Sequence, residues 1–238
     1  MEEWKKFAHM PVHYIEADQA FPDVSQSEPE GLLAFGGDVS PDRLLMAYPK
    51  GIFPWYNDGQ PVLWWAPHDR CVLHPARMHV SKNMRRYIRQ LKFRVKMDTA
   101  FNQVVQACGH IGSNRDGGTW LNDALKESLS ELHERGIAHS IESWRGGKLV
   151  GGLYGVSLGG MFFGESMFAS EPDASKVALY HLCQWMLANN MDLIDCQIPN
   201  DHLISLGAEM MPENEFYPFL AESVKKTTQK GPWKVMTP

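Results

Sequence analysis

Two apolar, strand-like runs decide the fold of this chain: residues 161–168 read MFFGESMF and residues 191–198 read MDLIDCQI. A helical pattern at 175–190 lies between them. A strand–helix–strand order of this kind is typical of a βαβ crossover, which places two parallel strands in one sheet. Each run also carries polar side chains among apolar neighbours, and these polar groups are candidates for a functional site.

The polar side chains are Glu165 in the first run and Asp195 and Gln197 in the second. Burying a carboxylate without a partner costs on the order of several kcal/mol, so such groups are usually satisfied or take part in chemistry. Because side chains alternate along a strand, we expect Asp195 and Gln197 on one face and Cys196 on the other. This parity favours a catalytic carboxylate–amide pair over a cysteine nucleophile. The alternative is that Glu165 and Asp195 only cap backbone groups or form ion pairs.

Regular elements extend from these runs in both directions. The patterns, in chain order, are helices at 99–108 and 121–135, strands at 138–144, 149–157 and 161–167, a helix at 175–190, the strand around Asp195 and a helix at 200–206. Glycine pairs at 146–147 and 159–160 mark the two turns of a three-stranded meander. This order predicts an α+β fold whose mixed sheet is flanked by helices, and it resembles the GNAT acetyltransferase fold.

The part of the chain before about residue 96 has a different, turn-rich character. Ser40 before Pro41 is typical of a helix start, and the short helix is expected to run through Met46. A strand pattern follows at 63–73, with prolines at its margins. We therefore expect a small N-terminal α/β domain at 1–96, ending in a basic helix, and a GNAT-like domain at 97–238.

Composition limits the class of protein. With 238 residues, 44% of them hydrophobic, the chain can bury the core of one large domain or two small ones. It contains no run of eighteen apolar residues, and its first twenty residues lack the apolar stretch of a secretory signal. The four cysteines form no CxxC pair. We therefore expect a cytoplasmic protein with reduced thiols and no membrane partner.

Positive charge is concentrated in one segment. Eight Lys or Arg and no acid occur between His74 and Met97, which leaves 15 basic against 28 acidic residues elsewhere. The segment contains a helical pattern with Ser81 as the expected N-cap and the apolar residues Met84, Tyr87, Ile88 and Leu91 on one face. The cations expected to meet phosphate are Arg77, Lys82, Arg85, Arg86 and Arg89. An ordinary solvated helix face is the alternative, but such faces usually mix charges, so phosphate binding is favoured.

Two other site types are weakly indicated. A coenzyme A-dependent acetyltransferase would need glycine-rich amides to hold the pyrophosphate, yet the loop at 169–174 has no glycine and two acids. His68, Cys71 and His74 have a spacing that could suggest a metal ion. In a strand, a spacing of three residues puts neighbours on opposite faces, so we expect no metal there.

Collinear stretches from about Gly31 to Ala208 resemble the leucyl/phenylalanyl-tRNA–protein transferases of bacteria. The stretches are GLLAFGGDVSPDRLLMAYPKGIFPW, LWWAPHDRCVL, GTW, HSIESW, LVGGLYGV, FFGESMF, ASKVAL and LIDCQIPNDHLISLGA. The resemblance implies an aminoacyltransferase without a cofactor. Such an enzyme moves Leu, Phe or Met from aminoacyl-tRNA to the N-terminal Lys or Arg of a protein, which marks that protein for N-end-rule degradation. A monomer is expected.

The resemblance also implies roles for individual residues. Asp195 and Gln197 resemble the catalytic pair, and Glu165 resembles the group that engages the aminoacyl end. The side-chain pocket implied for the amino acid consists of Leu153, Phe162, Leu179, Leu182 and Met186. Trp55 and Trp120 resemble residues that hold the terminal adenosine and its amino acid. For Phe162 and Glu165 to face one cleft, the strand needs a bulge near Gly164.

The chemistry of such a transfer asks little of the protein. The donor is an activated ester, and roughly a tenth of an α-amine with a pKa near 8 is neutral at pH 7, a penalty of about 1.4 kcal/mol. Alignment by one carboxylate and one amide is then sufficient. The alternative from another class is a non-catalytic RNA-binding module that uses the basic helix and tryptophan stacking. It gives no reason for Asp195 and Gln197.

Overall fold

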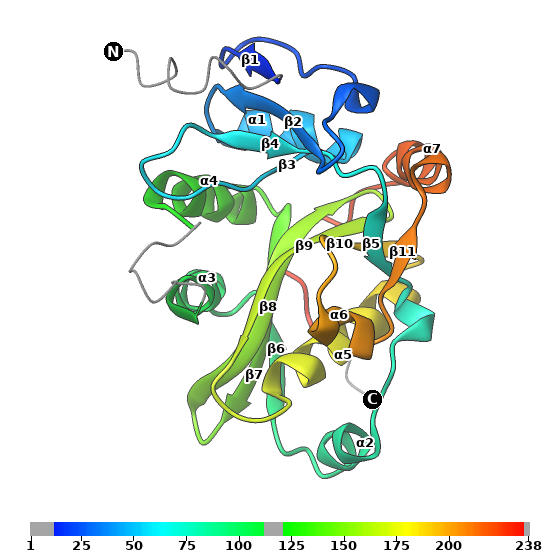
Figure 1. Ribbon diagram of the computed structural model, residues 1–238. Helices are drawn as coiled ribbons and strands as arrows, with labels where there is room; N and C mark the ends of the chain where they lie inside the picture. The colour runs from blue at the N-terminus through cyan, green and yellow to red at the C-terminus, as the bar shows by residue number, and fades with distance from the viewer. Residues whose placement is uncertain (1–11, 112–120, 236–238) are drawn as a thin grey trace.

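The computed structural model describes residues 12–111 and 121–235. Figure 1 shows a small sheet at the N-terminal end of the molecule and a larger sheet beneath it. Helices cover the larger sheet on both faces. The predicted α+β class, with a small N-terminal unit followed by a mixed sheet between helices, is confirmed.

The small sheet has four short strands in the spatial order β1-β2-β4-β3. These are β1 (His13–Ile15), β2 (Leu32–Gly36), β4 (Leu63–Trp65) and β3 (Phe53–Pro54). Helix α1 (Pro41–Ala47) begins as predicted, because the Ser40 hydroxyl accepts a hydrogen bond from the amide of Arg43. The 3₁₀ turn η3 (Tyr48–Lys50) follows and leads the chain into β3.

The large sheet has seven strands in the order β11-β5-β10-β9-β8-β7-β6. They are β5 (Arg70–Leu73), β6 (Arg94–Met97), β7 (Ala138–Arg145), β8 (Lys148–Leu158), β9 (Met161–Ala169), β10 (Leu193–Gln197) and β11 (Glu209–Met211). The predicted meander is β7–β8–β9, and β10 pairs with β9 in parallel as the crossover requires. All other neighbours are antiparallel.

Helices pack on the two faces of the large sheet. On one face lie α3 (Phe101–Ile111) and α4 (Asp123–Glu134), and on the other lies the crossover helix α5 (Ala174–Ala188). A Cβ at Gly151 of β8 would come within 2.5 Å of the Ala174 side chain, so this glycine lets α5 approach the sheet closely. Close contact fixes which side chains of α5 face the strands.

Three further helices complete the fold. They are α2 (Lys82–Arg89), α6 (Asp201–Ser205) and α7 (Glu213–Ser223), with 3₁₀ turns η2 (Val24–Gln26) and η4 (Pro75–Arg77) between other elements. Each of the helices predicted from the sequence is present, with ends that differ by a few residues. Gly136 adopts a left-handed φ of 71° directly after α4, as a helix-ending glycine should.

The strand pattern at 63–73 is two strands and not one. Pro67 has no N–H to donate and interrupts the ladder, so β4 joins the small sheet while β5 joins the large one. Since β5 and β6 also belong to the large sheet, we propose that the boundary between the two units lies between Trp65 and Arg70, earlier than residue 96. No helix in the described ranges is long and apolar enough to cross a membrane.

Candidate functional site

The parallel strands β9 and β10 part at the point where their polar residues begin. They pair from Leu193 with Met161 to Asp195 with Phe163, and then diverge. On the other side of β9, Gly164 pairs with Gly155 but Ser166 pairs with Tyr154. Glu165 is therefore the extra residue of a β-bulge, which confirms the bulge predicted near Gly164. The bulge turns the Glu165 side chain toward the space between the strands.

Strand β10 carries a second bulge, which the sequence did not signal. Asp195 pairs with Val72 and Gln197 pairs with Cys71, so Cys196 is the extra residue. Gln197 has a left-handed φ of 63°. The expected alternation of side chains is broken at this point, and the parity prediction is wrong. Cys196 and Gln197 face a cavity, whereas the Asp195 side chain is 1% exposed and lies behind it.

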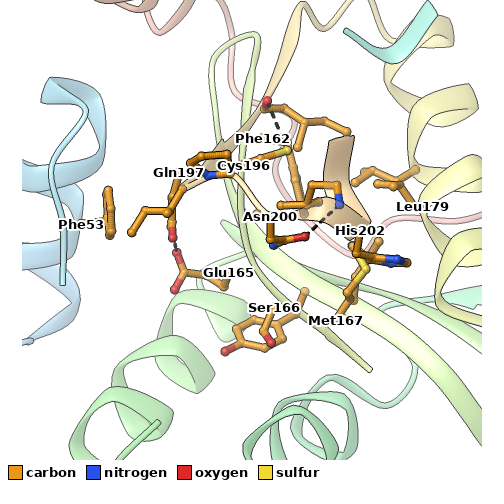
Figure 2. A pocket seen from close by; sticks show the side chains of 18 of the residues that line it. Phe53, Phe162, Glu165, Ser166, Met167, Leu179, Cys196, Gln197, Asn200 and His202 are labelled. Carbon is orange, nitrogen blue, oxygen red and sulfur yellow. Dashed lines mark hydrogen bonds between the residues drawn. The ribbon is translucent and has the colours of Figure 1, made fainter. Parts of the chain in front are cut away.

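A cavity of about 480 Å³ opens between the small sheet, β9, β10 and the helices α5 and α6 (Figure 2). Its size is within the usual range for small-molecule sites. The residues that line it are Phe53, Pro54, Trp55, Leu153, Tyr154, Phe162, Gly164, Glu165, Ser166, Met167, Leu179, Leu182, Ile194, Cys196, Gln197, Ile198, Pro199, Asn200, His202 and Leu203. Apolar side chains line most of the wall. Glu165 and Gln197 form a polar group on one side of the cavity, whereas His202 of α6 lies on the other side, beside Leu179 (Figure 2).

The apolar end contains four of the five residues predicted for the side-chain pocket. Leu153 comes from β8, Phe162 from β9, and Leu179 and Leu182 from α5. Met186 is also buried, but it lies one helical turn beyond Leu182 and packs in the core without lining the cavity. A helical face continues past the cavity into the protein interior, so spacing alone could not mark where the pocket stops.

The polar end is a hydrogen-bonded network centred on Glu165. Its Oε1 accepts one hydrogen bond from the Tyr48 hydroxyl (3.0 Å) and one from Nε2 of Gln197 (3.0 Å; Figure 2). A carboxylate can only accept, so Gln197 must turn its NH₂ to Glu165 and keep its carbonyl oxygen free. Oε2 of Glu165 also has no protein partner among the described residues. Two acceptor oxygens are thus available to an amine or ammonium group.

The environment of Glu165 moves its titration into the neutral range. Burial raises the pKa of Glu165 to about 7, although the hydrogen bonds from Tyr48 and Gln197 lower it and the nearby Asp195 carboxylate raises it. Burial, helped by the Glu165 charge, holds the pKa of the Tyr48 hydroxyl well above its usual value. Tyr48 therefore stays a hydrogen-bond donor, while Glu165 can change its protonation near neutral pH.

Asp195 supports this network from behind. Its Oδ1 accepts a hydrogen bond from the backbone N–H of Gln197 (2.8 Å) and lies 3.2 Å from Nε of the buried Arg70. Burial raises the pKa of Asp195, whereas the Arg70 guanidinium and the Gln197 N–H lower it. Asp195 does not line the cavity, and its hydrogen bond from Gln197 connects it to the cavity wall. The predicted catalytic pair thus consists of one residue at the cavity and one behind it.

Of the two tryptophans predicted to hold an adenosine, Trp55 lies within the described residues. Trp55 is 46% exposed at the rim of the cavity, and its ring centroid lies 5.6 Å from that of Trp65. An exposed aromatic face of this kind can stack with a base. Trp120 lies outside the described residues.

The basic helix α2 forms as predicted, at the end of the molecule away from the small sheet (Figure 1). Ser81 caps it by accepting from the Met84 amide. Its four exposed cations are Lys82, Arg85, Arg86 and Arg89, and none has an acidic partner in the described part of the chain. Arg77 differs, because its Nη1 lies 2.8 Å from Oε1 of Glu209. The predicted apolar face ends early: Leu91 is 82% exposed because the helix stops at Arg89.

The residues of the weak metal pattern have separate partners. His68 pairs with Glu213, and His74 lies 3.5 Å from Glu209. Cys71 is buried, and a hydrogen bond between its thiol and that of Cys196 lowers the pKa of Cys71. The three side chains do not meet, and no cluster of three potential ligands occurs in the described ranges.

Several residues of the site were missed by sequence reasoning. Tyr48 lies 117 positions before Glu165, and Arg70 lies in a short strand that pairs with β10 only in the fold. Phe53 was seen only as part of a turn. Tyr48 and Phe53 lie in GLLAFGGDVSPDRLLMAYPKGIFPW and Arg70 lies in LWWAPHDRCVL, two of the stretches that carried the resemblance, and this was the signal that the sequence offered for them.

Known proteins similar to this chain point to one family. Residues 72–221 match the family model described as leucyl/phenylalanyl-tRNA protein transferase, and residues 37–68 match the model of its N-terminal domain. Two relatives in Anaeromyxobacter carry the name leucyl/phenylalanyl-tRNA–protein transferase. The protein of Anaeromyxobacter sp. (strain K) is 45% identical over 95% of this chain and 97% of its own length. That of Anaeromyxobacter sp. (strain Fw109-5) is 47% identical over 94% of this chain and 95% of its own length. The one in Nitratidesulfovibrio vulgaris (strain DP4) is 46% identical over 93% of this chain and 96% of its own.

One solved structure also shows a limited likeness. The structure of L-PGS from Bacillus licheniformis superimposes with a TM-score of 0.38 at 11% identity, covering 71% of this chain and 54% of that chain. The family assignment does not depend on it.

Proposed function

This chain belongs to the leucyl/phenylalanyl-tRNA–protein transferase family of aminoacyltransferases, and from that premise we propose how it uses its cavity. It transfers leucine, phenylalanine or methionine from aminoacyl-tRNA to the N-terminal Lys or Arg of an acceptor protein. The observation that carries this proposal is the Tyr48–Glu165–Gln197 network at the polar end of a largely apolar cavity. The apolar end takes the side chain of the amino acid, and the polar end takes amino groups.

The apolar end suits a hydrophobic side chain such as that of Leu, Phe or Met. Leu153, Phe162, Leu179 and Leu182 offer contact area and no hydrogen-bonding groups. A polar side chain would lose its hydration there without a compensating partner, at a cost of about 1–3 kcal/mol. The pocket therefore selects against polar amino acids more strongly than it distinguishes Leu, Phe and Met from one another.

The polar end aligns the two reacting groups. The acceptor amine nitrogen attacks the ester carbonyl carbon, the new C–N bond forms, and the C–O bond to the terminal ribose breaks. One amine proton leaves, and one proton ends on the ribose oxygen. Glu165 Oε2 and the Gln197 carbonyl oxygen accept hydrogen bonds from amino groups and hold them in line for this step. The donor ester is already activated, so no covalent enzyme intermediate is needed.

The tRNA is held at two further places. The terminal adenosine stacks on Trp55 at the rim, and phosphates bind Lys82, Arg85, Arg86 and Arg89 on α2. Arg77 contributes less, because Glu209 already neutralises it. We further propose that the enzyme works as a cytoplasmic monomer, that it uses no cofactor, and that its products are marked for N-end-rule degradation.

The direct test is transfer of labelled leucine from Leu-tRNA to a peptide with an N-terminal Arg. The same peptide with an acetylated N-terminus is the matched control, because it lacks the attacking amine. We expect transfer to the free peptide and none to the acetylated one. Tight tRNA binding without transfer would instead indicate a non-catalytic RNA-binding module, and acetyl transfer from acetyl-coenzyme A would indicate the third class.

A further inference from the structure

Two arginine side chains are completely buried within the described residues. Arg43 in α1 is 1% exposed and Arg70 in β5 is 0% exposed. The guanidinium of Arg43 lies 3.9 Å from the Phe21 ring centroid, and its Nη1 donates to the Gln19 carbonyl oxygen. No carboxylate lies within ion-pair distance of it in the described ranges. Arg70, in contrast, faces Asp195, and this difference indicates that the two arginines have different tasks.

Arg70 connects three elements around the site. Its Nε lies 3.2 Å from Oδ1 of Asp195 on β10, and its Nη2 donates to the carbonyl oxygen of Gly51, two residues before Phe53. Its guanidinium carbon also lies 5.1 Å from the ring centroid of Phe53 and 4.8 Å from that of Phe216. One side chain thus touches both the strand that carries Gln197 and the turn that supplies one wall of the cavity.

The oxygen that faces Arg70 is the same atom that holds Gln197. Oδ1 of Asp195 accepts the backbone N–H of Gln197 at 2.8 Å. The left-handed φ of 63° at Gln197 is unfavourable for a residue other than glycine and persists only if its surroundings enforce it. The N–H···Oδ1 bond holds the peptide plane between Cys196 and Gln197, from which the Gln197 side chain starts. A neutral acid in place of the carboxylate would make this bond weaker.

We propose that Arg70 is a positioning residue for aminoacyl transfer. It holds Asp195 as a carboxylate, and the carboxylate in turn holds Gln197 in the conformation that directs its amide to Glu165. This inference rests on the proposed function, since transfer is its readout. Arg70 does not line the cavity and acts through Asp195 and Gln197.

The groups around Asp195 explain why one cation matters. Besides Arg70, the titratable groups that act on or are affected by Asp195 are Glu165 on β9, Tyr48 on η3, Tyr217 on α7, Cys71 on β5 and Cys196 beside it. All five are acidic or neutral, so none of them carries a positive charge that would stabilise the Asp195 carboxylate. Arg70 is the cation that stabilises the Asp195 carboxylate against burial.

The test uses the full chain with Arg70→Met, Arg70→Lys and Asp195→Asn, and Arg43→Met as the matched buried-arginine control. Single-turnover leucine transfer to an Arg-terminated peptide is measured at saturating Leu-tRNA. We expect Arg70→Met to lower the rate at pH 7 by about 10²-fold and Arg70→Lys by about 10-fold, since lysine keeps the charge without the planar fork. Arg43→Met should lower the melting temperature while the rate of the folded enzyme stays within about 3-fold of wild type.

Two readouts separate positioning from a merely structural role. In Arg70→Met, loss of the cation raises the pKa of Asp195, so a larger fraction of Asp195 is protonated than in wild type; the rate of the variant relative to wild type should therefore rise as pH increases from 6.5 to 8.5. The relative rate of Asp195→Asn should not change with pH. In the double variant Arg70→Met/Asp195→Asn the buried charges are removed together, so the melting temperature should recover above both single variants while the rate stays low.

Three results would overturn the inference: a wild-type rate in folded Arg70→Met, a pH-independent relative rate for that variant, or a rate that recovers with stability in the double variant. If Arg70→Met does not fold, the transfer rates of Arg70→Lys and of the double variant test the inference in its place: wild-type rates in both would overturn it. The failure of the proposed function is distinguishable, because wild-type protein would then transfer no leucine at all.

Discussion

The two ends of the cavity are built in different ways. The apolar end consists of side chains at regular positions of β8, β9 and α5, held by packing without directional bonds. The polar end depends on two β-bulges, on a left-handed residue and on hydrogen bonds that converge on one oxygen of Glu165. A wall of packed apolar side chains can change in volume and still bind a hydrophobic group. A network of hydrogen bonds that share one oxygen loses several contacts when one residue is replaced. Substitutions at the apolar end should therefore alter preference, and those at the polar end should alter rate.

The strongest test of this contrast is Gln197→Leu. It keeps much of the bulk but removes both the donor to Glu165 and the free acceptor oxygen. We expect single-turnover transfer to fall by about 10²-fold or more, in the range of a positioned polar group, with little change in Leu-tRNA affinity. Rate and affinity are measured separately, at saturating tRNA and by equilibrium binding. A near-wild-type rate would mean that the polar end does not align the reacting groups.

Glu165→Gln is expected to have the next largest effect, and it should depend on pH. With a pKa of about 7, Glu165 is a carboxylate above neutral pH and protonated below it, so the wild-type rate should decline as pH falls through 7. The variant should lose about 10- to 100-fold at pH 8 and much less at pH 5.5, where Glu165 of the wild type is protonated too. The measurement is the ratio of variant to wild-type single-turnover rates from pH 5.5 to 8.5, in which the decline caused by protonation of the acceptor α-amine cancels. A ratio that does not change with pH would assign the difference to a group other than the Glu165 carboxylate.

The same substitution should change stability in the opposite direction. Because the folded pKa of Glu165 lies above its ordinary value, the carboxyl group favours the folded state at low pH, and this contribution is lost as pH rises through 7. Glu165→Gln should therefore raise the melting temperature at pH 8 by a few degrees relative to wild type, and the gain should vanish at pH 5. Thermal unfolding at both pH values checks the sign.

At the apolar end, Phe162→Leu should change donor preference more than rate. Removing the ring enlarges the pocket and should favour Phe-tRNA over Leu-tRNA by about 10-fold relative to wild type, since misfits of this size are worth about 1–3 kcal/mol. Met186→Ala is the control, because Met186 is buried behind the lining. It should cost about 2–5 kcal/mol of stability and leave the donor ratio constant. A changed ratio in the control would extend the pocket to Met186.

Two variants should have the smallest effects on rate at saturating donor. Arg85→Ala combined with Arg89→Ala removes two phosphate contacts remote from both ends, so tRNA affinity and its salt dependence should fall while the saturated rate and the donor ratio hold. Cys196→Ala removes a small side chain from the wall, and a rate within about 3-fold of wild type is expected. Abolished transfer in folded Cys196→Ala would give the thiol a role that the cavity does not suggest.

The sequence predicted the regular parts of the molecule, and four of its five pocket candidates line the apolar end of the cavity. Periodicity located α5, and with it Leu179 and Leu182, because a helical face is a local property. The bulge at Glu165 was predicted because Phe162 and Glu165, three positions apart, would face opposite sides of a regular strand although both were expected in one cleft. The bulge at Cys196 was not, and therefore Asp195 was expected in the cavity. Tyr48 and Arg70 could not be found by pattern, since each reaches the site through a contact distant in sequence.

The hydrogen bond between Tyr48 and Glu165 has a consequence for the order in which the molecule folds. It spans 117 positions, whereas the meander β7–β8–β9 forms from strands that follow one another directly. Closing a long loop costs conformational entropy before the contact that closes it can form, so hairpins between neighbouring strands form before contacts between distant residues. A refolding chain should thus recover its sheet before its active site, and enzymatic activity should return in a kinetic phase slower than that of the circular dichroism signal.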